Sequence, residues 1–301
     1  NRRDYELVKH VSLSVLDPMA LLKLKAEGKC TVTIPKALFD LDHSGHYMRR
    51  LKSVSLSVPC TAGPYASVAC RLTLLSNRYR RSPTAANPAA YPENVGQDDR
   101  FVYNIGGIQS IATSQGQNDT GMFELNFRDE RYLPFKGCGA IGAWQIEFGS
   151  QFRSFDAASI SDVVIHIHYT AREGGSGLKS AVDGALVGRL NQIENAVKKS
   201  GLLRTIDLRH EAPDAWARLK QSKAAPFAVT SDMLPQFTVG HGPTLSDAWV
   251  LVRAAGQPAT FAFTLDGNPL TANKDVLVKG LCSTALPAPL PIAIGTAFTL
   301  G

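Results

Sequence analysis

Strict alternation of apolar and polar residues over short segments is the feature that most limits how this chain can fold. The alternation is clearest at residues 53–58, and it recurs at residues 123–127 and 144–148. Successive side chains of a strand point to opposite faces, so this pattern predicts strands with one buried and one wet face. Antiparallel sheets commonly carry such strands. We therefore expect a mainly β fold, an antiparallel β-sandwich with short helices.

One helix of the first half is marked by its ends. Asp17 suits an N-cap, Pro18 suits the first helical position, and Gly28 suits the residue that ends a helix. Residues 82–99 contain three prolines and many small or polar residues, which predicts a long loop. Further strands are expected at residues 11–16, 31–34 and 69–75, and around residue 165, where Val163, Ile165, Ile167 and Tyr169 share one face.

The period of the pattern changes after a glycine-rich segment. Residues 174–177 read as a flexible hinge, and the apolar residues from Leu178 to Val197 then recur at helical spacing, which predicts an amphipathic helix ending near Gly201. Short strand candidates follow at residues 203–208, 248–252, 260–265 and 276–278, with a hairpin turn at Asp266 and Gly267. We expect two domains, a β-sandwich at residues 1–175 and a helix with a smaller β-rich unit at residues 176–301.

Composition excludes several classes of protein. The 301 residues are 44% hydrophobic, enough for a sizeable core, and the net charge of +6 is dispersed, which argues against a nucleic-acid-binding protein. The five cysteines are odd in number and lack a Cys-x-x-Cys motif, so free buried thiols are favoured over zinc or disulfides. There is no apolar stretch of about 20 residues and no signal peptide. Because the chain begins at Asn1, we expect a fragment or a processed product.

Two clusters carry metal-ligand chemistry. Residues 40–46 open like a calcium loop, but the position of the bidentate Glu is Leu51, so a turn of the Asx type is the alternative. His166 and His168 lie on one strand face with Asp162, a set that suits zinc but also arises on any wet strand face. We expect no functional metal and no cofactor.

The remaining motifs do not assemble a catalytic set. The glycines at residues 106–107 and 137–139 match neither a P-loop nor a dinucleotide fingerprint, and there is no Gly-x-Ser-x-Gly elbow. Residues 118–120 form a glycosylation acceptor or a polar turn. Trp144, Trp216, Trp249 and the eight tyrosines belong mostly to a core, or they supply a sugar-binding platform. We expect no enzyme, and a carbohydrate-binding β-sandwich for host-cell attachment is the alternative function.

An ordered series of segments resembles the C-terminal region of the A component of bacterial Tc (toxin complex) insecticidal toxins. The most specific are LFDLDHSGHYMRR at residues 38–50, KSVSLSVPC at residues 52–60 and DVVIHIHYT at residues 162–170. The others lie at residues 4–6, 16–21, 63–65, 118–127 and 132–137. The resemblance extends over residues 4–172, and it is weaker in the tail, at residues 207–211 and 214–216.

The resemblance implies a non-enzymatic assembly module. In such toxins the A component is a homo-pentamer whose C-terminal collar docks the B component at the entrance of an injection channel. It implies a secreted or cell-surface protein that meets membranes only through upstream channel helices outside residues 1–301. It also gives residues 40–50 a third interpretation, a structural signature formed by Asp40, Asp42, His46, Arg49 and Arg50, in which one of the arginines pairs with one of the aspartates.

Overall fold

The computed structural model describes most of the chain, and by its contacts the chain divides into two units, Asn1–Ala196 and Val197–Gly301. We describe each unit by itself. The described residues are 3–61, 67–94, 98–115, 122–126, 133–149, 155–201, 204–221, 223–234, 244–245, 247–253, 256, 258–275, 280–286, 292–293, 295 and 297–300.

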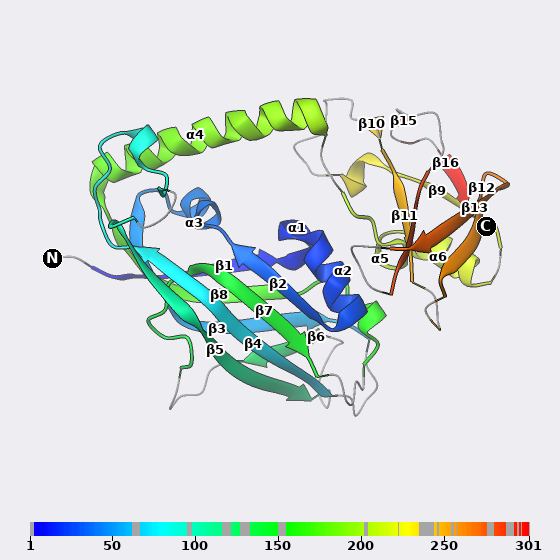
Figure 1. Cartoon of the computed structure of the whole chain (residues 1–301), viewed down its shortest axis with the longest axis horizontal. Helices are drawn as coiled ribbons and strands as arrows, with labels where there is room; N and C mark the ends of the chain where they lie inside the picture. The colour runs from blue at the N-terminus through cyan, green and yellow to red at the C-terminus, as the bar shows by residue number, and fades with distance from the viewer. Residues whose placement is uncertain are drawn as a thin grey trace. The chain divides into compact units, whose positions relative to one another are not determined.

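The first unit is built on two four-stranded antiparallel sheets (Figure 1). One sheet has the order β1-β8-β3-β6, with β1 at Tyr5–Ser12, β8 at Val164–Glu173, β3 at His46–Pro59 and β6 at Met122–Asn126. The other has the order β2-β7-β4-β5, with β2 at Lys29–Ile34, β7 at Ile141–Phe148, β4 at Ser67–Arg80 and β5 at Phe101–Gln115. The mainly β, antiparallel sandwich predicted from the sequence is confirmed.

The core of the first unit draws on both sheets. Trp144 of β7 and Tyr169 of β8 are almost completely buried, and both belong to one cluster of buried side chains. Their rings meet Phe135 and Phe39 edge to face, with centroids 5.1 and 5.2 Å apart. Such contacts add to the free energy gained by burying large aromatic side chains. The alternating residues recognised in the sequence therefore supply this core.

The alternation in β3 correctly predicts a strand, but the prediction that its polar face is exposed to solvent is wrong. Ser53, Ser55 and Ser57 are at most 8% exposed, so the face expected to be wet is covered. The strand lies between β8 and β6, and the hydroxyl of Ser57 lies 2.7 Å from Nε2 of His166. Serine is small enough to pack beneath neighbouring side chains and keeps a hydrogen-bond partner there.

The predicted strand at residues 11–16 is wrong in its second half. Strand β1 ends at Ser12, and helix α1 occupies Leu13–Leu16, so Val15 is 82% exposed rather than buried beside Val11. Helix α2 follows at Pro18–Glu27, capped by Asp17 and ended by Gly28 at a φ of 79°, as the sequence predicts. Figure 1 shows α1 and α2 following one another beside β2.

The connections around β3 and β4 carry two further differences. Helix α3, at Lys36–Asp42, includes the first half of the predicted Asx turn, which leaves only residues 43–45 as a turn before β3. The predicted loop at residues 82–99 is present and contains a short 3₁₀ helix, η1, at Pro88–Ala90. Strand β5, which follows this loop, was not predicted, because its apolar residues alternate irregularly around Gly106 and Gly107.

The predicted amphipathic helix is α4, at Gly175–Ser200. The predicted hinge is wrong in its placement, since Gly175 to Gly177 form the start of this helix rather than a linker. Leu178, Ala181 and Val182 pack against Tyr47 and Tyr91, with partly buried neighbours that include Ala85 and Leu186. The contact-based division at residues 196 and 197 falls inside α4, and the functional boundary between residues 175 and 176 stays a prediction.

The second unit contains two short helices, α5 at Leu208–Glu211 and α6 at Pro213–Lys220, and a turn of 3₁₀ helix, η4, at Ser231–Met233. Its six-stranded sheet has the order β11-β14-β13-β12-β16-β9. These strands are β9 at Ala225–Ala228, β11 at Trp249–Val252, β12 at Thr260–Leu265, β13 at Asn268–Lys274, β14 at Cys282–Ala285 and β16 at Ala297–Leu300. A two-stranded sheet pairs β10, at Thr244–Leu245, with β15, at Ile292–Ala293.

The sequence predicts part of this second sheet. The strands at residues 248–252 and 260–265 correspond to β11 and β12, and the predicted hairpin joins β12 to β13. Asp266 and Gly267 both have positive φ, 48° and 80°, as a type I′ turn requires. The strand predicted at residues 203–208 is wrong, since residues 204–207 are not in a strand and α5 begins at Leu208. The strand predicted at residues 276–278 lies outside the described residues.

The five cysteines are free thiols. Burial raises the pKa of Cys30 and of Cys70 to about 12, so both stay protonated at neutral pH. Within the described part of the chain, no helix combines the length and the apolar character needed to cross a bilayer.

Candidate functional site

Asp40 is the centre of a buried network of charges in the first unit. It lies at the end of α3, it is 2% exposed, and it accepts a hydrogen bond from Nη1 of Arg49 at 2.6 Å. The hydroxyl of Tyr91 donates to the same carboxylate at 2.8 Å. Arg49 is itself 3% exposed and also donates to the carbonyl oxygen of His43 at 2.9 Å. Buried charges need partners of this kind, because water no longer solvates them.

Lys36 adds a second cation to this network. Its Nζ lies 3.8 Å from Asp40, one helical turn away, and 3.4 Å from the centre of the Tyr91 ring. That nitrogen is buried, and none of the described residues forms a hydrogen bond with it. Burial lowers the pKa of Lys36 to about 8, while the attraction of Asp40 opposes the shift and the nearby arginines reinforce it.

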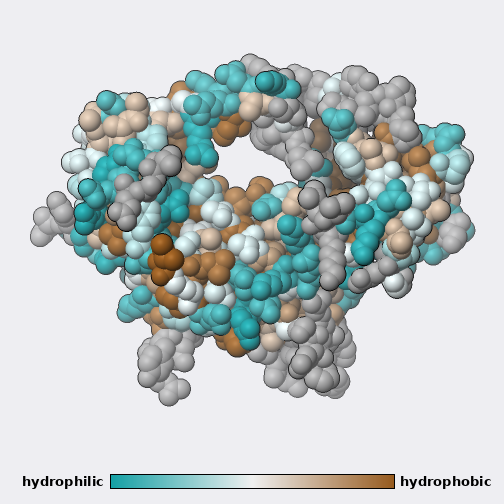
Figure 2. Space-filling view, viewed as in Figure 1, coloured by the Kyte–Doolittle hydropathy of each residue, from teal (hydrophilic) through white to brown (hydrophobic). Residues whose placement is uncertain are grey.

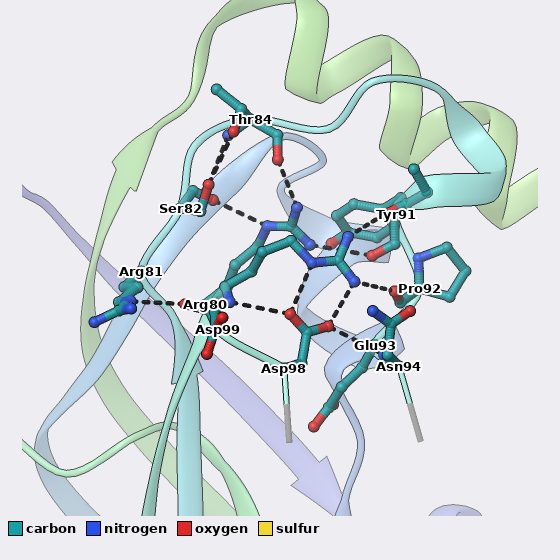
Figure 3. Close-up of polar contacts among 12 residues, drawn as sticks. Arg80, Arg81, Ser82, Thr84, Tyr91, Pro92, Glu93, Asn94, Asp98 and Asp99 are labelled. Atoms are coloured by element: carbon teal, nitrogen blue, oxygen red, sulfur yellow. Dashed lines mark hydrogen bonds and ion pairs between the residues drawn. The ribbon is translucent and has the colours of Figure 1, made fainter. Parts of the chain in front are cut away.

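Two arginines fix the loop that carries Tyr91. Figure 3 shows Arg80 pointing toward Ser82, Thr84 and Tyr91, and its guanidinium donates to their carbonyl oxygens at 2.8–3.1 Å. The guanidinium also lies over the Tyr91 ring, 5.0 Å from its centre. Arg80 therefore links the polar groups of this loop to the aromatic ring that Lys36 and Asp40 contact.

The second of these arginines is Arg100, which binds both oxygens of Asp98, at 2.8 and 2.5 Å. It also donates to the carbonyl oxygens of Ala90 and Pro92. The hydrogen bonds from Arg100 hold the pKa of Asp98 well below its usual range. The loop is thus held by guanidinium groups that satisfy its carbonyls, although the sequence predicts it only as an irregular segment.

The five signature residues do not form one site. Arg49 and Asp40 are the pair that the structure brings together, whereas Asp42 is bound by Lys9 at 2.7 Å. The ring of His46 stacks on that of Tyr5, with centroids 5.4 Å apart, and burial followed by the nearby His43 and Arg49 lowers its pKa. Arg50 lies next along β3, and its Nε is buried with no hydrogen-bond partner in the part of the chain that the structure describes.

The residues considered as metal ligands point to other partners. Asp40 and Asp42 are engaged by different cations, so they do not converge as calcium ligands would. Asp162 accepts hydrogen bonds from the hydroxyl of Ser12 at 2.5 Å and from the N–H of Ser14 at 2.9 Å, and it thereby fixes the start of α1. Among the residues that the structure describes, no group of three His, Cys, Asp or Glu side chains is arranged to hold a metal.

The histidines of β8 lie in a cross-strand cluster. Nδ1 of His10 lies 2.6 Å from Nδ1 of His166, whose Nε2 faces Ser57. A hollow of about 430 Å³ near this face is lined by residues that include Glu6, Lys52, Ser53 and His168. Glu6 contacts Nζ of Lys52 at 2.8 Å. The hollow therefore has a carboxylate and an imidazole in its lining. The carboxylate of Glu6 contacts the ammonium group of Lys52, not a base that it could orient for catalysis.

The remaining candidates separate in the structure. Trp144 is buried in the core, Trp216 is 37% exposed on α6, and Trp249 is 65% exposed on β11. The possible glycosylation acceptor at residues 118–120 lies outside the described residues. Trp144 is therefore a core residue, whereas Trp216 and Trp249 reach the surface.

Strand β5 forms one edge of its sheet, and the sequence analysis missed this strand. It is 15 residues long, lies last in its sheet and contains neither proline nor a charged residue. Ile105 is 92% exposed and Ile111 is 64% exposed. Natural edge strands are usually protected by charges, prolines or a covering segment, because their free backbone groups pair with other chains. The absence of charge over residues 101–115 is the signal that marks this edge in the sequence.

Elsewhere on the face drawn in Figure 2, hydrophobic residues reach the surface in separate patches bordered by hydrophilic ones. Isolated apolar residues of this kind are normal on soluble proteins. The combination of an uncharged edge and two strongly exposed isoleucines on β5 is therefore more informative about binding than exposure alone.

Comparisons with known proteins agree on one family. The family model described as the Tc toxin complex TcA C-terminal TcB-binding domain matches residues 1–171. The chain is 35% identical over 188 residues to toxin subunit YenA2 of Yersinia entomophaga, a match that covers 60% of this chain and 14% of that subunit. The chain thus spans about a seventh of the length of this relative.

Among solved structures, the cryo-EM structure of Yersinia pseudotuberculosis TcaA-TcaB is similar with a TM-score of 0.31 and 22% identity, covering 57% of this chain and 10% of that one. Turnip yellow mosaic virus follows with a TM-score of 0.27 and 12% identity, covering 57% of this chain and 82% of that one. These structural scores are too low to carry an argument, and the family rests on the match over residues 1–171. By that match, the chain belongs to the family of TcA C-terminal TcB-binding domains of Tc toxin complexes.

Proposed function

We propose that this chain is a non-enzymatic assembly module that docks the B component, TcB, at the entrance of the injection channel of a Tc toxin. The family match over residues 1–171 supports a binding role. We further propose that the module acts within a homo-pentameric A component that is secreted or held at the bacterial surface. In this proposal Asp40, Arg49 and the other signature residues serve the fold and do not contact TcB.

The edge of β5 is the surface that we propose for docking. An exposed strand edge offers a row of backbone donors and acceptors, and a partner strand or loop can pair with that row. Ile105 and Ile111 supply apolar area beside it. Because residues 101–115 lack charge, covering this edge does not bury an unpaired ion. We propose that TcB covers this edge.

The test uses the full chain fused to a five-stranded coiled coil and immobilised on a sensor surface. The wild-type fusion should bind the cognate TcB, and the double variant Ile105→Lys with Ile111→Lys should bind at least about tenfold more weakly, the equivalent of about 1.4 kcal/mol. The control is Val15→Lys, which places a lysine on a similarly exposed apolar residue of α1 and should leave binding unchanged.

Two results would count against the proposal. Absence of detectable binding by the pentamerised wild type would remove the docking function itself. Equal binding by the wild type and the β5 double variant would leave docking in place but move it to another surface. Circular dichroism and thermal unfolding of each variant separate a lost surface from a lost fold.

A further inference from the structure

The six-stranded sheet of the second unit has one face without charge. Cross-strand partners share a face of a sheet, and the register aligns Leu251 of β11 with Ser283, Ser283 with Asn273, and Asn273 with Thr260. Alternate positions along each strand belong to the same face. Every described residue that this rule assigns to the face of Asn273 is uncharged, on all six strands.

The two faces of this sheet differ in burial as well as in chemistry. The opposite face carries the core of the unit, which includes Leu265 and Phe298. On the uncharged face, Thr260, Thr271 and Asn273 are exposed. Solvent-facing sheet surfaces usually carry charged side chains, which keep a protein soluble. A wet face of hydroxyl and amide groups without ions therefore calls for a specific reason.

An exposed indole lies beside this row of polar groups. Trp249 is 65% exposed and Leu251, two residues further along β11, is 38% exposed. Strand geometry separates Trp249 and Leu251 by about 7 Å along β11. Leu251 and Asn273 lie in the same cross-strand row, and two strand spacings place their backbones about 10 Å apart. The indole thus lies within the length of a short oligosaccharide from Ser283, Asn273 and Thr260.

We propose that this uncharged face binds a neutral saccharide. A pyranose ring presents a C–H face, which packs on an indole, and a rim of hydroxyl groups, which exchange hydrogen bonds with hydroxyls and amides. Trp249 supplies the first kind of contact, and Ser283, Asn273 and Thr260 supply the second. Within the six strands this face carries no Lys or Arg, which argues against recognition of phosphate, sulfate or nucleic acid by charge.

This inference is independent of the proposed docking function. The face belongs to residues 226–299, whereas the family match ends at residue 171 and the β5 edge lies within it. A failure of TcB docking would leave the saccharide proposal untouched, and the reverse also holds.

The experiment titrates the full chain with soluble neutral hexasaccharides of β-glucan, chitin, mannan and galactan, and with a heparin hexasaccharide as the anionic comparison. Binding is followed by calorimetry and by tryptophan fluorescence. At least one neutral probe should bind with a Kd of about 1 mM or tighter, and salt should not weaken the binding. Trp249→Ala should reduce its affinity at least about tenfold, while Trp249→Tyr retains most of it.

Trp216→Ala is the matched control, since it removes an exposed tryptophan from α6 rather than from the sheet, and it should bind like the wild type. Asn273→Ala should weaken binding about threefold or more, which tests the polar row separately from the indole. The proposal is overturned if none of the neutral probes binds at 10 mM, if Trp249→Ala binds as the wild type does, or if only the heparin probe binds. It is also overturned if Trp249→Ala lowers affinity for TcB while no neutral probe binds.

Discussion

At the scale of single residues, the charge network around Asp40 shows what a sequence can and cannot predict. The resemblance predicts that Arg49 or Arg50 pairs with Asp40 or Asp42, and Arg49 with Asp40 is the pair that occurs. Tyr91 was not linked to this network, because it lies 51 residues from Asp40 and reaches it only through the loop that Arg80 holds. Contacts that depend on how a loop closes leave no local pattern in the sequence.

Lys36 gives a prediction about pH. Its pKa is about 8 in the folded chain against 10.5 as the ordinary value, so between these pH values the unfolded chain binds a proton that the folded chain has lost. Stability should therefore rise with pH across this window, and protonated Lys36 should cost the folded state at most roughly 3 kcal/mol at pH 7. Lys36→Met should raise the free energy of unfolding at pH 7 and flatten its rise between pH 8 and 10.5.

Urea unfolding at several pH values measures this effect. Lys52→Met is the control, because it removes a lysine whose side chain is 47% exposed and lies outside the Asp40 network. If Lys36→Met destabilises the chain at pH 7, the attraction of Asp40 and the Tyr91 ring outweighs the desolvation of the ammonium group, and the prediction is wrong.

At the scale of elements, the ends of strands and helices depend on side chains that lie far away in sequence. Periodicity extends the first strand to residue 16, but Ser12 accepts a hydrogen bond from the N–H of Val15, and Asp162 accepts one from Ser14. These bonds satisfy the first N–H groups of α1 and favour a helix. Asp162 lies 148 residues from Ser14, so no local pattern could predict its effect.

Helix α2 and the β12–β13 hairpin were predicted because their signals are local. Asp17, Pro18 and Gly28 define the two ends of the helix by their own chemistry. The same holds for Asp266 and Gly267, whose positive φ values are intrinsic to the turn that joins adjacent strands. Elements that carry their own start and stop residues are those that the sequence predicts correctly.

The packing of α4 on the loop near Pro88 gives a prediction with a built-in control. A Cβ added to Gly184 would meet the Pro88 ring at 2.6 Å, whereas one added to Gly188 would meet nothing within 4 Å. Alanine in place of glycine normally stabilises a helix by about 1 kcal/mol. Gly188→Ala should therefore raise the free energy of unfolding, whereas Gly184→Ala should lower it by roughly 1–3 kcal/mol, because the helix must move away from the loop.

Chemical unfolding of the two variants measures the difference directly. Hydrogen exchange adds a local readout, since Gly184→Ala should lower the protection of amides in the first half of α4 and Gly188→Ala should not. Equal stabilisation by both substitutions would show that Pro88 can move away from a Cβ at residue 184 without loss of stability, and it would contradict the prediction.

At the scale of the whole molecule, the chain joins a recognised module to a unit outside the match. The family match covers residues 1–171, and the contact-based second unit begins at Val197. The composition of the chain predicts a globular protein with a sizeable core, and the resemblance predicts its family. The uncharged face of the second sheet could not be predicted, because it depends on the register of six strands that are not consecutive in their sheet.

The length of the match bears on assembly. The match covers 14% of the related subunit YenA2. In the homo-pentamer that we propose, the parts of such a subunit outside the match should supply most of the contacts between subunits. We predict that the isolated chain is monomeric or weakly self-associating at micromolar concentration, because its own lateral contacts should bury too little area for a stable oligomer. It should also bind TcB far more weakly than a pentamer does, because a pentamer makes each later contact intramolecular.

Light scattering and sedimentation velocity at several concentrations test this prediction. A pentamer that persists at micromolar concentration would show that the contacts within residues 1–301 are sufficient. The affinity for TcB should then be compared between the free chain and its coiled-coil fusion, and equal affinities would exclude the avidity argument.

Because β1 pairs with β8, it has to remain unpaired for a time during protein synthesis. Ser12 pairs with Val164, so β1 has no partner in this sheet until 152 further residues have been translated. At the usual 5–20 residues per second, that interval is about 8–30 seconds. Throughout this interval β1 has no strand partner and is accessible to chaperones and proteases. The sheet is complete only after β8, the last of its four strands to be translated, pairs with both β1 and β3.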